Sequence, residues 1–345
     1  MKTKLPISNK TGAFTLIEVM VSMVIVLILV LVFSTMTDRT AKIWRDTRGK
    51  VSQFQQARDA FDLITRNLSQ ATLNTYLDYY DAKGARREAG NVATFEPSRY
   101  GRYSDLRFVT GKASQILGLP EKQCPSQALF FYAPLGETGV TANTSLNHLL
   151  NLVGYYISYD ADTERPNFMP IAQGYGFRLM ELRQRSESLT MPKPGLVWPP
   201  AVTNHPDAHI VARNIVALTF LPKLAETGAA AARTADGIGQ ALAPNYQYDS
   251  HTKGRGEQRK ELNSMHQLPP IVEVTMVAID QDSAERLGRE STPPDFGLEQ
   301  LFQNADPDVN RKDLETLLSR LTELHINARV FRTEVALKGA KWSHE

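Results

Sequence analysis

The 345-residue chain has little of what small exported domains use to hold themselves together. It has one cysteine, Cys124, so no disulfide can form within it, and its net charge of +2 indicates no specialised polyanion partner. The stretch from Phe14 to Tyr80 has no proline and a single glycine, Gly49, so nothing in it interrupts a long helix. We therefore expect stability to come from one core of helix and sheet, for which the chain is long enough.

Common catalytic signatures are also missing. The sequence has no Gly-x-Ser-x-Gly elbow, no phosphate-binding loop and no paired-cysteine site. His205-x-Asp207-x-His209 could present two imidazoles and a carboxylate to a metal, but Pro206 favours a turn that leads into a strand. We predict no enzyme activity, no catalytic residue, no metal and no cofactor.

A second pattern superficially resembles a calcium loop. Asn304-x-Asp306-x-Asp308 has the acidic spacing of such a loop, but Val309 stands where the sharp turn needs glycine. The pattern is more typical of a helix start, with Asp306 as the cap and Pro307 as the first helical residue.

Acidic side chains are absent from residues 1–13, which carry three lysines. This composition favours retention of the segment on the cytoplasmic side of a membrane. From Phe14 to Met36 the chain is apolar apart from a few hydroxyls and one ionisable residue, Glu18. A helix over this stretch would rise roughly 34 Å at about 1.5 Å per residue, enough to cross a hydrocarbon core of about 30 Å. We predict one membrane span, residues 14–36.

An ordinary secretory signal peptide and a simple signal anchor are the alternatives for this segment. Residues 34–38 lack a clear small-x-small cleavage site, and Glu18 is a strange choice for the apolar part of a signal peptide. Five basic residues follow the span: Arg39, Lys42, Arg45, Arg48 and Lys50. Counted alone, they would favour the opposite orientation.

The tract Gly12-Ala13-Phe14-Thr15-Leu16-Ile17-Glu18 resembles the processing and methylation motif of type IV prepilins and type II secretion pseudopilins. The resemblance implies that residues 1–13 are a leader removed by a prepilin peptidase, and that the new terminal Phe14 is N-methylated. Cleavage between Ala13 and Phe14 makes Glu18 the fifth mature residue, which is the family spacing. Cleavage after Gly12 remains the alternative.

In that family the glutamate is thought to meet the terminal amine of a neighbouring subunit. Two opposite charges are tolerable in a low-dielectric core when they are paired, so a subunit docked in the wrong register would leave both unpaired. We therefore expect Glu18 to set the register of assembly. The alternative is a carboxylate near the interface that reaches back to water.

The helix is predicted to continue beyond the membrane. Apolar residues recur at spacings of three and four along one stripe: Phe54, Ala57, Phe61, Ile64, Leu68 and Ala71. We interpret residues 37–80 as the amphipathic continuation of one spine helix, packed on a globular domain. A free coiled coil is the alternative, although the pattern holds for only about three heptads.

Residues 81–345 are predicted to form a mainly antiparallel β domain, so the fold class is α+β and pilin-like. Short aromatic and β-branched runs indicate strands over 105–110, 127–133, 152–159, 175–184, 211–222, 271–280 and 328–337. A leucine stripe over 314–324 indicates a second amphipathic helix before the last strand. We expect 80–102 to be a polar linker and 225–265 to be a surface insertion.

Further segments resemble cassette protein C of the Verrucomicrobia-type prepilin cassettes and, more distantly, the minor pseudopilin J of type II secretion. They are Ser104–Val109, Ala128–Gly136, Gly154–Tyr156 with Phe177–Glu181, Leu268–Asp280 and Arg329–Phe331.

This resemblance implies a minor pseudopilin-like subunit anchored in the inner membrane, with its C-terminal domain in the periplasm. Its partners would be other prepilins, a prepilin peptidase and an inner-membrane assembly platform, with no nucleic acid. The alternative is an adhesion or substrate-binding module displayed on such a filament.

Overall fold

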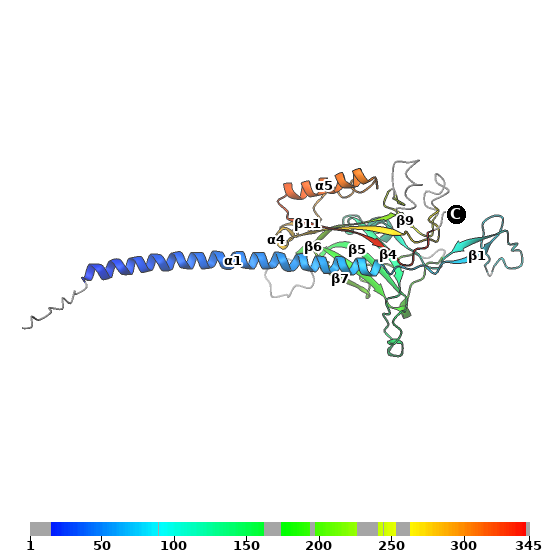
Figure 1. The fold of residues 1–345 in the computed structure, drawn as a ribbon, viewed down its shortest axis with the longest axis horizontal. Coiled ribbons are helices and arrows are strands. Elements are labelled where there is room, and N and C mark those ends of the chain that lie inside the picture. Colours follow the sequence, from blue (N-terminus) through cyan, green and yellow to red (C-terminus); the bar gives the residue numbers. More distant parts are fainter. Residues whose placement is uncertain are drawn as a thin grey trace, which may run out of the picture. The chain divides into compact units, whose positions relative to one another are not determined.

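The computed structural model describes residues 15–88, 90–161, 174–193, 197–225, 241–243, 245–252 and 263–342. The chain divides into two compact units, Met1–Ser52 and Gln53–Glu345, which are described separately. Helix α1 (Leu16–Leu68) begins in the first unit and ends in the second (Figure 1).

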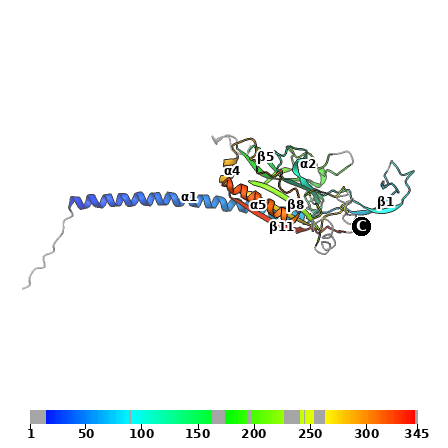
Figure 2. The ribbon, with the colours of Figure 1, turned by 90° about the horizontal axis from the view of Figure 1, so that it is seen from above.

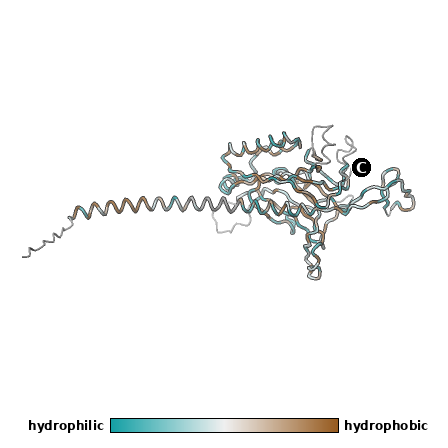
Figure 3. The backbone as a smooth tube through the Cα atoms, in the orientation of Figure 1, coloured by the Kyte–Doolittle hydropathy of each residue, from teal (hydrophilic) through white to brown (hydrophobic). Residues whose placement is uncertain are grey.

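In the first unit α1 is apolar over its N-terminal part, as the hydropathy colouring shows (Figure 3). The hydroxyls of this part bond to carbonyls of their own helix: Ser22 to Val19, Thr35 to Val32, Thr37 to Phe33 and Thr40 to Met36. Each hydroxyl therefore satisfies its donor within the helix, which lowers the cost of placing it in an apolar environment.

The second unit is built mainly from antiparallel strands. In chain order they are β1 (Tyr76–Tyr80), β2 (Arg99–Tyr103), β3 (Val109–Lys112), β4 (Gln127–Ala133), β5 (Asn151–Ala161), β6 (Tyr175–Gln184), β7 (Ala208–Arg213), β8 (Ile215–Lys223), β9 (Tyr248–Asp249), β10 (Ile271–Ile279) and β11 (Ala328–Ala336). They form a six-stranded sheet ordered β7-β6-β5-β4-β3-β9, a three-stranded sheet ordered β11-β10-β8, and the two-stranded β1-β2 hairpin. The α+β fold with a long N-terminal helix is thus as predicted.

The other helices among the described residues are α2 (Ala113–Leu117), α4 (Gln281–Leu287) and α5 (Pro307–Glu323), with 3₁₀ turns at Thr141–Asn143 and Ser186–Ser188. Helix α5 begins as predicted, because the Asp306 side chain accepts hydrogen bonds from the backbone N–H groups of Asp308 and Val309. Its buried residues Leu317 and Leu321 join the main core. Figure 2 shows α5 running alongside the three-stranded sheet.

Both faces of the six-stranded sheet are covered. One face packs in a single apolar cluster with the end of α1 and the three-stranded sheet; Phe131 and Val153 of the sheet contribute to this cluster together with Ile64 of the helix. The other face holds a smaller cluster with α2 and the segment around Trp198. The predicted apolar stripe of α1 is therefore confirmed as the surface that covers a sheet.

The predicted end of α1 is wrong. The helix ends at Leu68 rather than continuing to residue 80, because the Thr72 backbone N–H donates to the Tyr132 carbonyl and so joins the end of β4. The tyrosine-rich run 76–80 then forms β1, in keeping with the β preference of aromatic residues.

Several strand predictions match closely. The bounds of β4 and β6 coincide with the predicted ranges, and β10 and β11 each end one residue earlier. The predicted strand over 105–110 lies instead at Val109–Lys112.

The range predicted as one strand over 211–222 is two strands. They are divided at Asn214, whose φ of 63° lies in the left-handed region that asparagine tolerates better than most residues. The Asn214 N–H donates to Phe177 of the six-stranded sheet, and its carbonyl accepts from Ile279 of the three-stranded sheet. This residue therefore passes the chain from one sheet to the other.

The two segments predicted as irregular, 80–102 and 225–265, also differ from their predictions. Residues 80–102 are not a plain linker, because they include the end of β1 and most of β2. Of the predicted surface insertion, the described residues carry β9, which pairs with β3, and the buried side chains of Ala243, Tyr246 and Tyr248. This part belongs to the core, while 226–240, 244 and 253–262 lie outside the described residues.

Candidate functional site

The first turn of α1 holds Glu18 against Thr15. Oε2 of Glu18 accepts hydrogen bonds from the backbone N–H and from Oγ1 of Thr15, both at 3.0 Å, and the Glu18 N–H donates to the Thr15 hydroxyl at 3.4 Å. This reciprocal pattern is a capping box, which satisfies N–H groups that a helix start leaves open. The sequence analysis missed it, although Thr-x-x-Glu is its signature.

The capping box bears on the predicted role of Glu18. Within one chain its carboxylate already has two donors, so an amine from a neighbouring subunit would have to compete with Thr15. The assembly role of Glu18 stays a prediction. The processing residues Ala13 and Phe14 lie outside the described residues.

A long apolar surface follows Glu18 along α1. Within Leu16–Ala41, an 18-residue window has a mean hydropathy of 3.1, and none of that window is buried within the protein. A soluble monomer rarely exposes so large a contiguous apolar surface. By length and composition this is the one helix among the described residues that could span a membrane.

The end of α1, within the second unit, is fixed by aromatic and aliphatic contacts. Ile64 and Leu68 are fully buried, and the ring centroids of Phe61 and Phe331 on β11 lie 5.8 Å apart. The Arg329 guanidinium lies 5.6 Å from the centroid of the Phe331 ring and 6.0 Å from that of Phe54. The helix is thus anchored to the three-stranded sheet as well as to the six-stranded one.

A polar cluster centred on a buried carboxylate lies at the end of α1. Glu181 on β6, 1% exposed, accepts from the Tyr155 hydroxyl at 2.6 Å, from Nη2 of Arg183 at 2.6 Å and from Nε2 of His209 at 2.8 Å. The Asn67 side chain, in the last turn of α1, donates to the Tyr155 hydroxyl at 2.8 Å. We call these five residues the Glu181 cluster; it ties the helix to three neighbouring strands.

Electrostatics in the Glu181 cluster favour the ionised pair. Burial alone would raise the pKa of Glu181, but hydrogen bonds from His209, Tyr155 and Arg183 together hold that pKa below its ordinary value. The bond to Glu181 raises the pKa of His209, against the opposing effect of burial. Sequence reasoning missed this cluster because its members come from distant positions in the chain.

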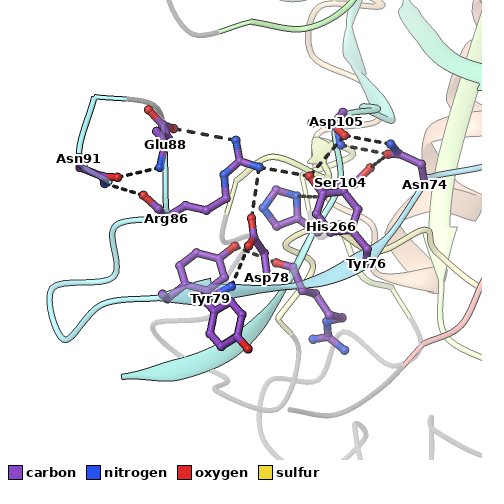
Figure 4. A network of polar contacts seen from close by, with 12 residues as sticks. Asn74, Tyr76, Asp78, Tyr79, Arg86, Glu88, Asn91, Ser104, Asp105 and His266 are labelled. Carbon is purple, nitrogen blue, oxygen red and sulfur yellow. Dashed lines mark hydrogen bonds and ion pairs between the residues drawn. The ribbon is translucent and has the colours of Figure 1, made fainter. Parts of the chain in front are cut away.

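The β1-β2 hairpin is held by a second polar cluster (Figure 4). Nη1 of Arg86 donates to the Tyr76 hydroxyl at 3.2 Å and to Asp78 at 3.4 Å, and the guanidinium carbon lies 3.6 Å from the centre of the Tyr103 ring. We call Arg86 with these three partners the arginine clamp. An isolated hairpin is marginally stable, so such a clamp supplies order that the main core does not.

The structure also places the other residues that the sequence analysis considered. His205 and Asp207 lie in a turn, closed by the Ala208 N–H on the His205 carbonyl, that leads into β7 as predicted. No group of three or more His, Cys, Asp or Glu that could hold a metal occurs in the part of the chain that the structure describes. Cys124 is buried, which raises the pKa of its thiol to about 11.

The comparisons with known proteins agree with the prediction of a prepilin-type motif at the N-terminus. A family model described as the prokaryotic N-terminal methylation motif matches residues 8–34. No curated protein and no solved structure matches the chain. The motif and the exposed apolar helix together indicate a membrane-anchored protein with a prepilin-type N-terminus.

Proposed function

We propose that the protein is a minor pseudopilin-like structural subunit of an envelope filament of the type II secretion or type IV pilus kind. The observation that carries this proposal is the match of the methylation motif to residues 8–34, which overlaps the start of α1 (Leu16–Leu68); this helix is apolar at its start and buried in a β domain at its end. The resemblance to cassette protein C and to pseudopilin J, stated from the sequence, supports the same function.

In this function a prepilin peptidase removes the leader between Ala13 and Phe14, and Phe14 is N-methylated. Glu18 then exchanges its intramolecular partner Thr15 for the terminal amine of an adjoining subunit. Both states keep the carboxylate hydrogen-bonded, which is the condition for holding a charge in a low-dielectric surrounding.

The proposal places the second unit in the periplasm and the first in the inner membrane. The partners are other prepilins, the prepilin peptidase and the assembly platform. It assigns no catalytic role and no cofactor, because the sequence carries none of the catalytic motifs considered above. The size of the C-terminal domain favours a low-copy position over that of the main repeating subunit.

Mass spectrometry of the mature amino terminus tests the proposal. We expect a chain that begins at N-methyl-Phe14. A chain that begins near Thr37 would point to a secreted protein released by signal peptidase, and the pseudopilin proposal would then be abandoned. A start at Ala13 would retain the prepilin proposal and correct the cleavage position.

A second candidate function is a binding module displayed on the filament. It is favoured by a cavity of about 470 Å³ at the β9 edge of the six-stranded sheet, which is within the range of roughly 300–1,000 Å³ typical of ligand sites. Its lining includes Arg107, which bonds to both carboxylate oxygens of Asp249 and lies 5.2 Å from the centroid of the Trp198 ring. Ligand-dependent protection of 225–265 from protease would favour this function, whereas crosslinking to other prepilins alone would favour assembly.

A further inference from the structure

His266 lies at the base of the β1-β2 hairpin and contacts both of its ends. Its backbone carbonyl accepts a hydrogen bond from the hydroxyl of Thr75, the residue before β1, at 3.1 Å. Its Nδ1 accepts from the backbone N–H of Ser104, the residue after β2, at 3.2 Å (Figure 4). Its ring centroid lies 4.7 Å from that of Tyr103, the last residue of β2. We call these interactions of His266 with Thr75, Tyr103 and Ser104 the histidine contact.

The same residue is fixed to the body of the second unit. The His266 N–H donates to the Ser250 carbonyl at 2.6 Å, and the centroids of the His266 and His251 rings lie 5.5 Å apart. His266 is 4% exposed. Among the described residues, β1 and β2 pair with each other and with no other strand. The buried imidazole of His266 therefore joins a hairpin that stands outside the two larger sheets to the segment that follows β9.

The hydrogen bonds determine which nitrogen of the His266 ring carries its proton. Nδ1 accepts a backbone N–H, so it has no proton, and the proton of the neutral ring is on Nε2. Nε2 is buried and has no hydrogen-bond partner among the residues that the structure describes. A second proton has to bind to Nδ1, where it would oppose the N–H of Ser104. Charging the ring therefore breaks the hydrogen bond that holds the end of β2.

Burial and the surrounding charges both disfavour the charged form of the ring. Burial has the largest effect on the pKa of His266, and His251, Arg86 and Arg102 lower this pKa further, while Asp105 opposes them. The result is a pKa of about 4 for His266. Burial also lowers the pKa of His251. Both imidazoles are therefore neutral at neutral pH.

We propose that protonation of His266 at Nδ1 releases the β1-β2 hairpin from the body of the second unit in mild acid, while the two larger sheets stay folded. The released hairpin keeps the arginine clamp, but a two-stranded hairpin without a supporting core is marginally stable. The strands β1 and β2 therefore lose protection once the histidine contact is broken. This device is independent of leader cleavage, of methylation and of Glu18.

The Glu181 cluster responds to acid in the opposite way, which separates the hairpin from the core. The bond to Glu181 raises the pKa of His209, so its contribution to stability is fully present in mild acid. The pKa of Glu181 is lowered, so this carboxylate stays ionised there. The contact between the end of α1 and the six-stranded sheet is therefore kept at a pH that opens the histidine contact.

The pH range follows from the pKa of His266 in the closed and the opened forms. The opened form has the ordinary histidine pKa of about 6.5, and the closed form has a pKa of about 4. The histidine contact is therefore at full strength above about pH 6.5 and weakens as pH falls toward 4. At pH 5 the ratio of opened to closed hairpin should be about 20-fold higher than at pH 7.

Hydrogen exchange of the full-length chain in detergent, followed by mass spectrometry at pH 5 and pH 7, tests the proposal. Each rate is divided by the intrinsic exchange rate at the same pH, so that only the change in protection remains. We expect protection over 99–105 to be about 20-fold lower at pH 5, and protection over β10 to change by less than about two-fold. In His266→Asn protection should not depend on pH, because asparagine does not titrate. Asparagine also tolerates the φ of 57° at this position and has an oxygen that accepts from the Ser104 N–H.

His325→Asn is the matched control, because His325 is exposed and has a similar φ of 54°. This variant should lose hairpin protection at pH 5 as the wild type does. Equal hairpin protection at both pH values in the wild type, or a loss that persists in His266→Asn, would overturn the proposal. So would an equal loss over β10, which would show that the second unit unfolds as a whole. If His266→Asn does not fold, the comparison of 99–105 with β10 in the wild type still decides the matter.

Discussion

Replacing Phe61 by alanine tests whether the spine helix is part of the core of the second unit. Phe61 is 7% exposed, belongs to the main core cluster and contacts the Phe331 ring at 5.8 Å between centroids. Truncating a buried phenylalanine costs about 3–5 kcal/mol, which includes the cavity left behind. Because the aromatic contact with β11 is lost as well, we expect a value inside this range rather than below it.

The measurement is thermal unfolding of a soluble fragment that begins near residue 53, where the second unit starts. At about 2–4 °C per kcal/mol, a loss of this size corresponds to a drop in Tm of roughly 6–20 °C. Arg58→Ala is the matched control, because Arg58 is exposed on the same helix and should change stability by less than about 0.5 kcal/mol. A Phe61→Ala effect as small as that of the control would refute the burial of the stripe.

Three further predictions concern the Glu181 cluster, the membrane span of α1 and the N-cap of α5. The interaction that raises the pKa of His209 stabilises the fold fully below the ordinary histidine pKa, and this stabilisation is lost as pH rises through the raised value. The hydrogen bonds that lower the pKa of Glu181 stabilise the fold above the ordinary glutamate pKa, and this stabilisation is lost as pH falls through the lowered value. Unfolding measured against pH should therefore show an alkaline decline that is missing in His209→Gln, and an identical profile would contradict the pairing. Glu18→Val should insert into membranes at least as well as the wild type, because removing the charge lowers the transfer free energy of the span by as much as about 2.5–3.5 kcal/mol at full depth. The variant should nevertheless crosslink poorly to other prepilins, and normal crosslinking would show that Glu18 is dispensable. Asp306→Ala should cost about 1 kcal/mol in unfolding free energy through loss of the α5 cap, whereas Asp306→Asn should cost little.

Local features of this fold could be predicted from the sequence, and features made by distant residues could not. The stripe that ends at Ala71, the strands at 127–133 and 175–184 and the cap at Asp306 each follow from a few neighbouring residues. Their burial or hydrogen bonding is set by periodicity and by the chemistry of one side chain, which is what sequence patterns record.

The missed features depend on pairing across the chain. The end of α1 is decided by Tyr132, far along the chain, and the hairpin depends on Arg86 reaching back to β1 across a loop that itself has a polar composition. The Glu181 cluster unites residues of one helix and three strands, and no local pattern announces it. The capping box at Thr15 is local, but its residues were interpreted only through the methylation motif.

The left-handed corner at Asn214 has a consequence for how the second unit comes apart. The Asn214 N–H donates to Phe177 on β6 in the larger sheet, and the Asn214 carbonyl accepts from Ile279 on β10 in the smaller sheet. Opening either sheet at this corner removes a hydrogen bond of the other, so the amide protons of Asn214 and Ile279 should exchange with solvent at the same rate and respond together to denaturant. The two sheets would then behave as one cooperative element, and a protease should find no partly opened form in which one sheet survives without the other.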